Sequence, residues 1–144
     1  LIGMATDIVL PLECACRLSG KKDAESALKA LAKYTDGQLV ATDGKRGSWA
    51  LVQGGIYRQG IVPESASVDS TGCGDAFHAG YGIGLIEGWD LPLRMECGAW
   101  LASLVITKLG GRTALPFKKD IAKYARAGIS KQLRAKLLEI SKRK

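Results

Sequence analysis

A glycine-rich segment that runs directly into a helix constrains this chain more than any other feature. Residues 68–77 read Val-Asp-Ser-Thr-Gly-Cys-Gly-Asp-Ala-Phe, and the pattern predicts a helix from about Asp75 to Glu87. Gly72 and Gly74 let the backbone bend so that successive N–H groups point the same way. The first turn of the helix adds its own unbonded N–H groups and the positive end of its dipole. The segment therefore predicts an anion hole of the kind that holds phosphate oxygens.

Asp75 is expected to stand at the mouth of this anion hole. A carboxylate there repels a bound phosphate, so its presence indicates a task such as accepting the proton of an attacking hydroxyl group. Phosphoryl transfer fits this combination, because positioning and charge stabilisation do most of the catalysis in that reaction. The alternative interpretation is an ordinary glycine-rich turn in which Asp75 caps the helix, and composition alone does not separate the two.

The helix that follows carries three glycines, at positions 80, 82 and 84. Each costs roughly 1 kcal/mol relative to alanine inside a helix. Such a cost predicts that the helix packs closely against a neighbour. A second, mostly apolar helix is expected from about Leu93 to Lys108.

The rest of the chain alternates between strand and helix patterns. A helix is expected after Asp23, with its end near residues 36–37, and amphipathic helices are expected at about 118–127 and 130–142. Short apolar runs predict strands, and Gly54-Gly55 predicts a hairpin turn between the last two of them; the runs are residues 6–11, 38–42, 48–53 and 56–59. This order indicates an α/β fold in layers, with helices flanking a sheet.

The positive charge of the chain is confined to its end. The formal net charge is +7 over 144 residues, but residues 118–144 alone carry ten basic and two acidic side chains. A basic tail can bind a polyanion such as nucleic acid. Here Leu133, Leu137 and Leu138 form a stripe that would dock on the body, and no aromatic residue follows Tyr124, so we expect a solvated basic face and no nucleic-acid partner.

Two further properties bound the class of protein. The longest apolar stretch, residues 97–107, is too short to cross a bilayer, which takes about 20 residues, so no membrane partner is expected. The four cysteines match no zinc spacing and are too few for a disulfide scaffold. Reduced thiols and a cytoplasmic location are the expectation.

Residues 68–77 resemble the second signature of the ribokinase-like (PfkB) carbohydrate kinases, D-[ST]-T-G-[AC]-G-D-x-F. Two more segments follow the family's order. Residues 42–47, Thr-Asp-Gly-Lys-Arg-Gly, are similar to the strand-end segment that contacts the nucleotide, and Thr107–Pro116 resembles the loop beneath the adenine site. The resemblance runs from about Thr6 to Pro116 and covers the C-terminal half of a typical member.

The resemblance implies a role for each matching residue. Asp75 would be the general base, and the N–H groups of Gly72, Cys73 and Gly74 would hold the charge on the transferring γ-phosphoryl group. ATP and Mg²⁺ are the implied co-substrate and cofactor, with K⁺ as a candidate. The other implied contacts are Thr42, Gly44, Gly47, Gly110 and Gly111 for ATP, Asp69 and the Thr71 carbonyl for a monovalent cation, and Glu13 for Mg²⁺.

One departure concerns the magnesium positions. Where the family often has P-N-E-x-E, residues 11–15 read Pro-Leu-Glu-Cys-Ala, so Leu12 and Ala15 replace the two side chains that act on Mg²⁺ through water. Of the three family positions, only Glu13 keeps the family's residue. An ATP-dependent sugar kinase is the first hypothesis, and a nucleoside kinase of the same family or an inactive, kinase-like scaffold subunit are the alternatives.

The resemblance also sets an expected organisation. Residues 1–117 would be the C-terminal, ATP-binding and catalytic half of a ribokinase-like domain, and residues 118–144 a basic amphipathic helical tail packed on it. The partners would be a sugar and ATP, with a homodimer as a candidate assembly. The family's sugar-contacting residues lie mostly in a half that this sequence lacks, so we expect the 144-residue piece alone to be inactive.

Overall fold

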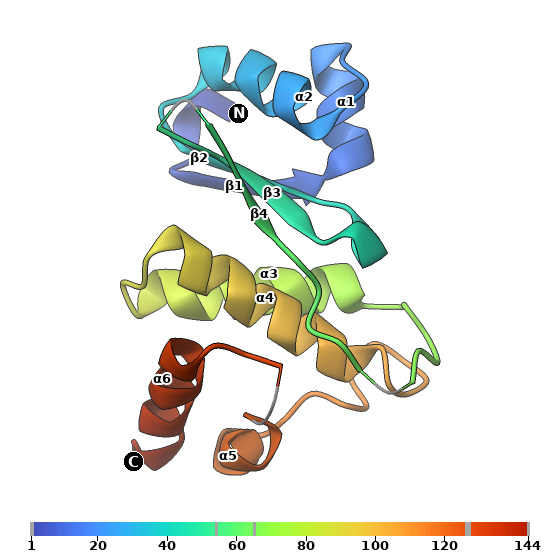
Figure 1. Ribbon diagram of the computed structural model, residues 1–144, viewed down its shortest axis with the longest axis vertical. Helices are drawn as coiled ribbons and strands as arrows, with labels where there is room; N and C mark the ends of the chain where they lie inside the picture. The colour runs from blue at the N-terminus through green and yellow to red at the C-terminus, as the bar shows by residue number, and fades with distance from the viewer. Residues whose placement is uncertain (1, 54, 65, 126–127, 144) are drawn as a thin grey trace. The chain divides into compact units, whose positions relative to one another are not determined.

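The computed structural model describes residues 2–53, 55–64, 66–125 and 128–143 (Figure 1). The chain divides into two compact units, Leu1–Gly60 and Ile61–Lys144. The expected basic tail lies within the second unit. Two expectations fall partly outside the described residues: Gly54 of the hairpin turn, and positions 126–127 at the end of the helix expected at 118–127.

The first unit contains a four-stranded sheet in the order β1-β2-β3-β4. β1 (Asp7–Pro11) runs parallel to β2 (Gln38–Thr42), whereas β3 (Ser48–Val52) and β4 (Gly55–Gln59) continue the sheet antiparallel. The four predicted strands are thus confirmed. A parallel pair needs a long crossover, which the chain makes through α1 (Leu12–Ser19), α2 (Ala24–Leu31) and the 3₁₀ turn η2 (Ala32–Tyr34).

Each of the two crossover helices buries one of its faces against the sheet. The apolar cluster of the unit joins Ala15 of α1, Leu28 and Leu31 of α2, and Leu39 and Ala41 of β2. In Figure 1, α1 and α2 accordingly lie together on one side of the strands. This cluster holds the two crossover helices against the strands.

The helix α2 was predicted and α1 was not. The Asp23 carboxylate accepts the N–H of Ser26 at 2.9 Å and caps α2, as expected. α1 begins directly after Pro11 and ends at Gly20, whose φ of 69° is left-handed. Two short 3₁₀ turns complete the unit, η1 (Ile2–Met4) and η3 (Gly44–Arg46).

The described residues of the second unit form helices joined by loops, with no strand among them. α3 (Cys73–Ile86) and α4 (Leu91–Val105) form an antiparallel pair, followed by η4 (Lys118–Asp120), α5 (Ile121–Tyr124) and α6 (Lys131–Lys142). α3 starts two residues earlier than predicted. α4 starts at Leu91 because the Asp90 carboxylate accepts the N–H of Leu93 at 3.0 Å, and it ends at Val105 rather than near Lys108.

Glycines let α3 and α4 approach closely. The predicted close packing of the α3 glycines is confirmed for Gly80 and Gly84. A Cβ built on Gly80 would lie 2.5 Å from the Cys97 carbonyl oxygen, and one on Gly84 would lie 3.1 Å from the Cα of Arg94. On the α4 side, a Cβ on Gly98 would lie 2.9 Å from the Phe77 ring. Gly82 differs, because a Cβ there meets nothing within 4 Å.

The tail helix α6 is anchored in the apolar core of its unit. Leu133 and Leu137 are 0% and 1% exposed and belong to the cluster that contains Trp100 of α4. The Arg143 guanidinium also forms an ion pair with Glu87, at 2.6 Å, just beyond the end of α3. Among the helices of the described residues, none has both the length and the apolarity that a membrane crossing requires.

Candidate functional site

The first turn of α3 presents backbone N–H groups at a left-handed bend. Gly72 has φ 78° and stands immediately before the helix, and its carbonyl accepts the first helical hydrogen bond, from the N–H of Ala76 at 2.9 Å. The N–H of Cys73 donates to the Ser70 carbonyl at 3.2 Å. Within the described ranges, the N–H groups of Gly72 and Gly74 have no acceptor. The bend therefore leaves two donors available at the positive end of the helix dipole.

Asp75 lies in this first turn and is exposed to solvent. No described residue forms a hydrogen bond or ion pair with its carboxylate. A Cβ on the neighbouring Gly74 would meet nothing within 4 Å, so the space beside Asp75 is open. A carboxylate in open space next to unbonded N–H groups can accept a proton from a ligand whose anionic part those groups hold.

Asp69 ties the segment before α3 to the loop after α4. One of its carboxylate oxygens accepts the N–H of Thr71 at 2.9 Å, and the other accepts the N–H of Gly110 at 2.9 Å. The Gly110 bond is the main cause that holds the pKa of Asp69 below its ordinary value, and the Thr71 bond is the next. The N–H groups of Val68 and Asp69 also donate to the Ile106 carbonyl, at 2.8 and 3.2 Å.

The same two loops touch through their glycines. A Cβ on Gly72 would lie 2.6 Å from the Cα of Gly111, and one on Gly111 would lie 3.3 Å from the Thr71 carbonyl oxygen. Two side chains cannot fit at this crossing. The structure thus brings Asp69, Thr71, Gly72, Gly110 and Gly111 together, although they are far apart in the sequence.

The oxygens at this crossing match the chemistry of a hard cation. The Asp69 carboxylate and the Thr71 carbonyl are oxygen ligands of the type that such cations prefer. Each carboxylate oxygen accepts one N–H bond and has a second lone pair to offer. These residues therefore fit the monovalent cation that the sequence resemblance implies.

The predicted nucleotide contacts of the first unit lie on a closed turn after β2. Thr42 ends β2, Gly44 opens η3, and the Asp43 N–H donates to the Gly47 carbonyl at 2.8 Å. Gly47 has φ 90°, and a Cβ there would collide with the Gln59 carbonyl of β4. The turn therefore requires glycine at position 47.

Glu13 lies in the first turn of α1 and is exposed. The two replaced positions beside it are used in packing: Ala15 is 0% exposed inside the apolar cluster of the first unit, and Leu12 packs against the same cluster. Across the described parts of the chain, no three or more His, Cys, Asp or Glu residues gather where they could share an ion. Glu13 thus offers a single carboxylate and no complete set of ligands for a divalent ion.

Cys73 is not set up as a reactive thiolate. Burial, and secondarily the charge of Asp69, raises the pKa of the Cys73 thiol above its ordinary value. The Cys73 thiol also donates to the Ala102 carbonyl at 3.7 Å. This residue acts as a half-buried filler between α3 and α4.

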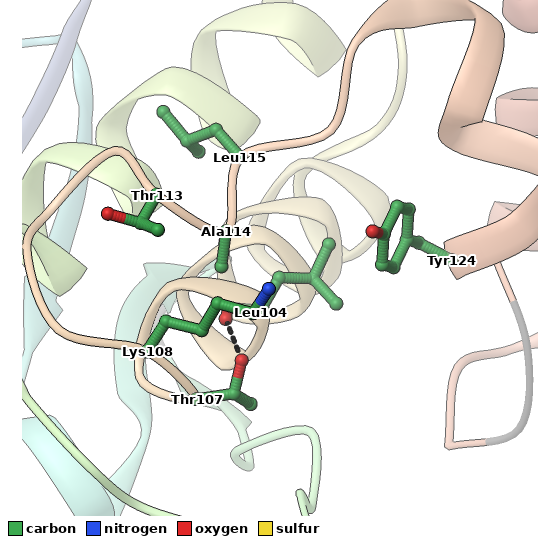
Figure 2. A pocket seen from close by; sticks show the side chains of 7 residues that line it. All are labelled: Leu104, Thr107, Lys108, Thr113, Ala114, Leu115 and Tyr124. Carbon is green, nitrogen blue, oxygen red and sulfur yellow. Dashed lines mark hydrogen bonds between the residues drawn. The ribbon is translucent and has the colours of Figure 1, made fainter.

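A small pocket of about 70 Å³ adjoins the loop after α4 (Figure 2). The Thr107 hydroxyl at its wall donates to the Leu104 carbonyl at 2.7 Å, and Lys108 brings an ammonium group. The sequence pointed to the loop after α4, but it did not predict that α5 would also line this pocket. Its lining residues are Leu104, Thr107, Lys108, Thr113, Ala114, Leu115 and Tyr124.

The family model "pfkB family carbohydrate kinase" matches residues 7–118. A curated relative, the fructokinase of Klebsiella pneumoniae, is 35% identical over 131 residues, which cover 83% of this chain and 41% of the relative. The chain thus spans less than half the length of that protein.

Solved structures agree on the fold. The ribokinase of Arabidopsis thaliana, in complex with ribose and ATP, matches with a TM-score of 0.71 and 24% identity over 100% of this chain and 43% of its own. The nucleoside kinase of Burkholderia thailandensis, in complex with inosine, matches with a TM-score of 0.70 and 25% identity over 85% of this chain and 41% of its own. The similarity therefore includes proteins that bind a sugar and proteins that bind a nucleoside.

Proposed function

Because the chain belongs to the pfkB family of carbohydrate kinases, we propose that it forms the ATP-binding and catalytic part of a kinase that phosphorylates a sugar hydroxyl group. The observation that carries this proposal is the first turn of α3, where an exposed carboxylate stands beside unbonded N–H groups. We also propose that this kinase is located in the cytoplasm and forms a homodimer.

The reaction would be an in-line phosphoryl transfer. The hydroxyl oxygen of the acceptor attacks the γ-phosphorus of ATP, the bond between that phosphorus and the β,γ-bridging oxygen breaks, and ADP leaves. Asp75 accepts the proton of the hydroxyl as the new P–O bond forms. The N–H groups of Gly72 and Gly74 would hold the charge on the transferring group. Cys73 would join them only if its N–H left the Ser70 carbonyl.

The remaining assignments concern ATP and ions. Thr42, Gly44 and Gly47 would contact the nucleotide, as would the loop that contains Gly110 and Gly111. Asp69 and the Thr71 carbonyl would hold a monovalent cation, K⁺ being the candidate. Glu13 would be the contact for Mg²⁺. A cation held by Asp69 and the Thr71 carbonyl would stiffen the nearby backbone, where Gly72 and Gly111 are in close contact.

Replacement of Asp75 by Asn tests the assignment of the base. In the full-length protein, Asp75→Asn should lower turnover by about 10²- to 10⁴-fold, because general-base catalysis contributes that much. ATP binding, measured by calorimetry, should persist since the N–H groups are unchanged. Asp36→Asn, an exposed carboxylate outside the proposed machinery, is the matched control and should keep full turnover.

Unchanged turnover in Asp75→Asn would show that Asp75 is not the general base. The acceptor is identified by assaying the wild-type protein on a panel of sugars and nucleosides, which separates a sugar kinase from a nucleoside kinase. We expect the 144-residue piece by itself to give no turnover on this panel.

A second candidate function is a kinase-like subunit without catalytic activity. The packing of Leu12 and Ala15 favours it, because both positions serve the apolar cluster rather than an ion. This candidate predicts that the full-length protein transfers no phosphoryl group to any acceptor in the presence of Mg²⁺ and K⁺. Robust turnover would exclude it.

A further inference from the structure

We propose that Asp43 and Arg46 are positioning residues for the nucleotide. Their ion pair holds the turn after β2 closed and neutralises a carboxylate that would otherwise repel ATP. The inference rests on the proposed function, which assigns nucleotide contacts to Thr42, Gly44 and Gly47 of this turn. It is carried by the geometry of the pair, by its place among those contacts, and by a second arginine that holds the turn from β4.

Two charge-assisted hydrogen bonds join the side chains of the pair. The Arg46 guanidinium donates through Nε to Oδ2 of Asp43 at 2.6 Å and through a terminal nitrogen to Oδ1 at 2.9 Å. A bidentate bond of this kind fixes both planar groups in one geometry, which a lysine ammonium cannot do. The Asp43 side chain is only 18% exposed, so loss of the guanidinium would leave a poorly solvated negative charge.

The main chain of the turn is tied to the same aspartate. The Arg46 N–H donates to the Asp43 carbonyl at 2.9 Å, and the Asp43 N–H donates to the Gly47 carbonyl at 2.8 Å. The side-chain bonds to Arg46 therefore reinforce a closure that the backbone already makes. This closure brings positions 42, 44 and 47 into one turn, which is the arrangement that the proposed nucleotide contacts require.

Arg58 of β4 anchors the turn to the sheet. Its guanidinium donates to the Arg46 carbonyl at 3.1 Å. It also lies 5.4 Å from the ring centroid of Trp49 on β3, a cation–π contact. The turn is thus held at its backbone by a bond that does not depend on the Asp43 carboxylate. Loss of the ion pair should loosen the turn without unfolding the unit.

The charge of Asp43 predicts an asymmetry between the two partners. Asp43 lies between Thr42 and Gly44, both of them proposed contacts of a polyanionic ligand. A like charge about 4 Å away in water lowers an affinity by a factor of about five. Loss of Arg46 removes the closure and also exposes ATP to this repulsion, whereas loss of Asp43 removes the closure alone.

A double-mutant cycle on the full-length protein tests the inference, with the Kd for ATP measured by calorimetry. Arg46→Ala should raise this Kd about 3- to 10-fold, because it loosens the turn and leaves the carboxylate unpaired. Asp43→Ala should raise it about 2- to 5-fold. The double variant should match Asp43→Ala and bind ATP more tightly than Arg46→Ala does. Arg46→Lys keeps the positive charge without the planar fork and should restore part of the loss.

Lys29→Ala is the matched control. Lys29 pairs with Glu25 on α2, also at 2.6 Å, and both side chains are exposed. This substitution breaks an ion pair of the same length outside the turn and should leave the Kd for ATP unchanged. In every variant kcat and the KM for the acceptor should change little, since the pair acts through the nucleotide contacts. Urea midpoints establish that each variant is folded.

Three results would each overturn the inference: an unchanged Kd for ATP in Arg46→Ala, a double variant that binds ATP more weakly than Arg46→Ala, or a loss confined to kcat or to the KM for the acceptor. A wild-type protein that binds no ATP would overturn it as well. A wild-type protein that binds ATP but transfers no phosphoryl group overturns the proposed function, and the Kd values still decide the role of the pair.

Discussion

The glycines of α3 allow the close packing of two helices to be tested with a single type of substitution. Gly80→Ala and Gly82→Ala add the same methyl group to the same helix, two residues apart. At position 82 the methyl group meets nothing within 4 Å. At position 80 it would lie 2.5 Å from the Cys97 carbonyl oxygen and 2.8 Å from the Cα of Gly98, both of them backbone atoms of α4.

The structure gives the two substitutions opposite signs. Gly82→Ala should raise the free energy of unfolding by up to about 1 kcal/mol, the difference in helix propensity between glycine and alanine. Gly80→Ala gains the same propensity but must push α4 away, and overpacking of this kind costs about 1–3 kcal/mol. Because propensity cancels between them, the difference between the two variants reports the steric cost alone.

Urea unfolding followed by circular dichroism measures this difference. We expect the midpoint of Gly82→Ala to lie above that of the wild type and the midpoint of Gly80→Ala to lie below it, with similar slopes. Equal shifts for the two variants would show that α3 and α4 are not held at the distance described. A stabilised Gly80→Ala would contradict the steric argument directly.

Two further predictions concern ionisable groups. The pKa of Asp69 is lowered from 3.8 by its bonds to Gly110 and Thr71, so its ionised form stabilises the folded state above pH 3.8 and loses this effect as the pH falls through the lower folded value. Urea midpoints of Asp69→Asn should therefore fall less steeply with acid than those of the wild type, and identical pH dependence would argue against the bridge. For the cysteines, iodoacetamide should label exposed Cys14 first and Cys97 only on unfolding, because burial raises the pKa of Cys97 to about 12. Peptide mass spectrometry over time gives the order, and early labelling of Cys97 would contradict its burial.

Local patterns were sufficient to predict most of the fold. The strands and the capped helix α2 carry their signals within a few residues, as Asp23 does in front of Ala27 and Leu28. The sequence did not predict α1, because Pro11 indicates the end of the preceding strand but carries no signal that a helix follows. Gly20, left-handed at its far end, was the signal that could have revealed it.

The candidate site was predictable where it depends on one segment. Asp75 and the glycines before it follow from residues 68–77 alone. The bridge from Asp69 to Gly110 and the crossing of Gly72 with Gly111 join residues about 40 positions apart. A pattern within one short segment cannot predict contacts between residues so far apart in the sequence. The bond from the Cys73 N–H to Ser70 was likewise unforeseen, since it depends on the exact bend before α3.

The anchoring of α6 has a practical consequence for anyone who reengineers this protein. Because residues 118–144 are strongly basic, one could think of ending the chain at residue 117 to improve its purification by ion exchange. That cut would also remove Leu133 and Leu137, which are enclosed in the core with Trp100. Exchange of exposed Lys131 and Arg134 for glutamine, by contrast, would lower the charge and leave the core closed.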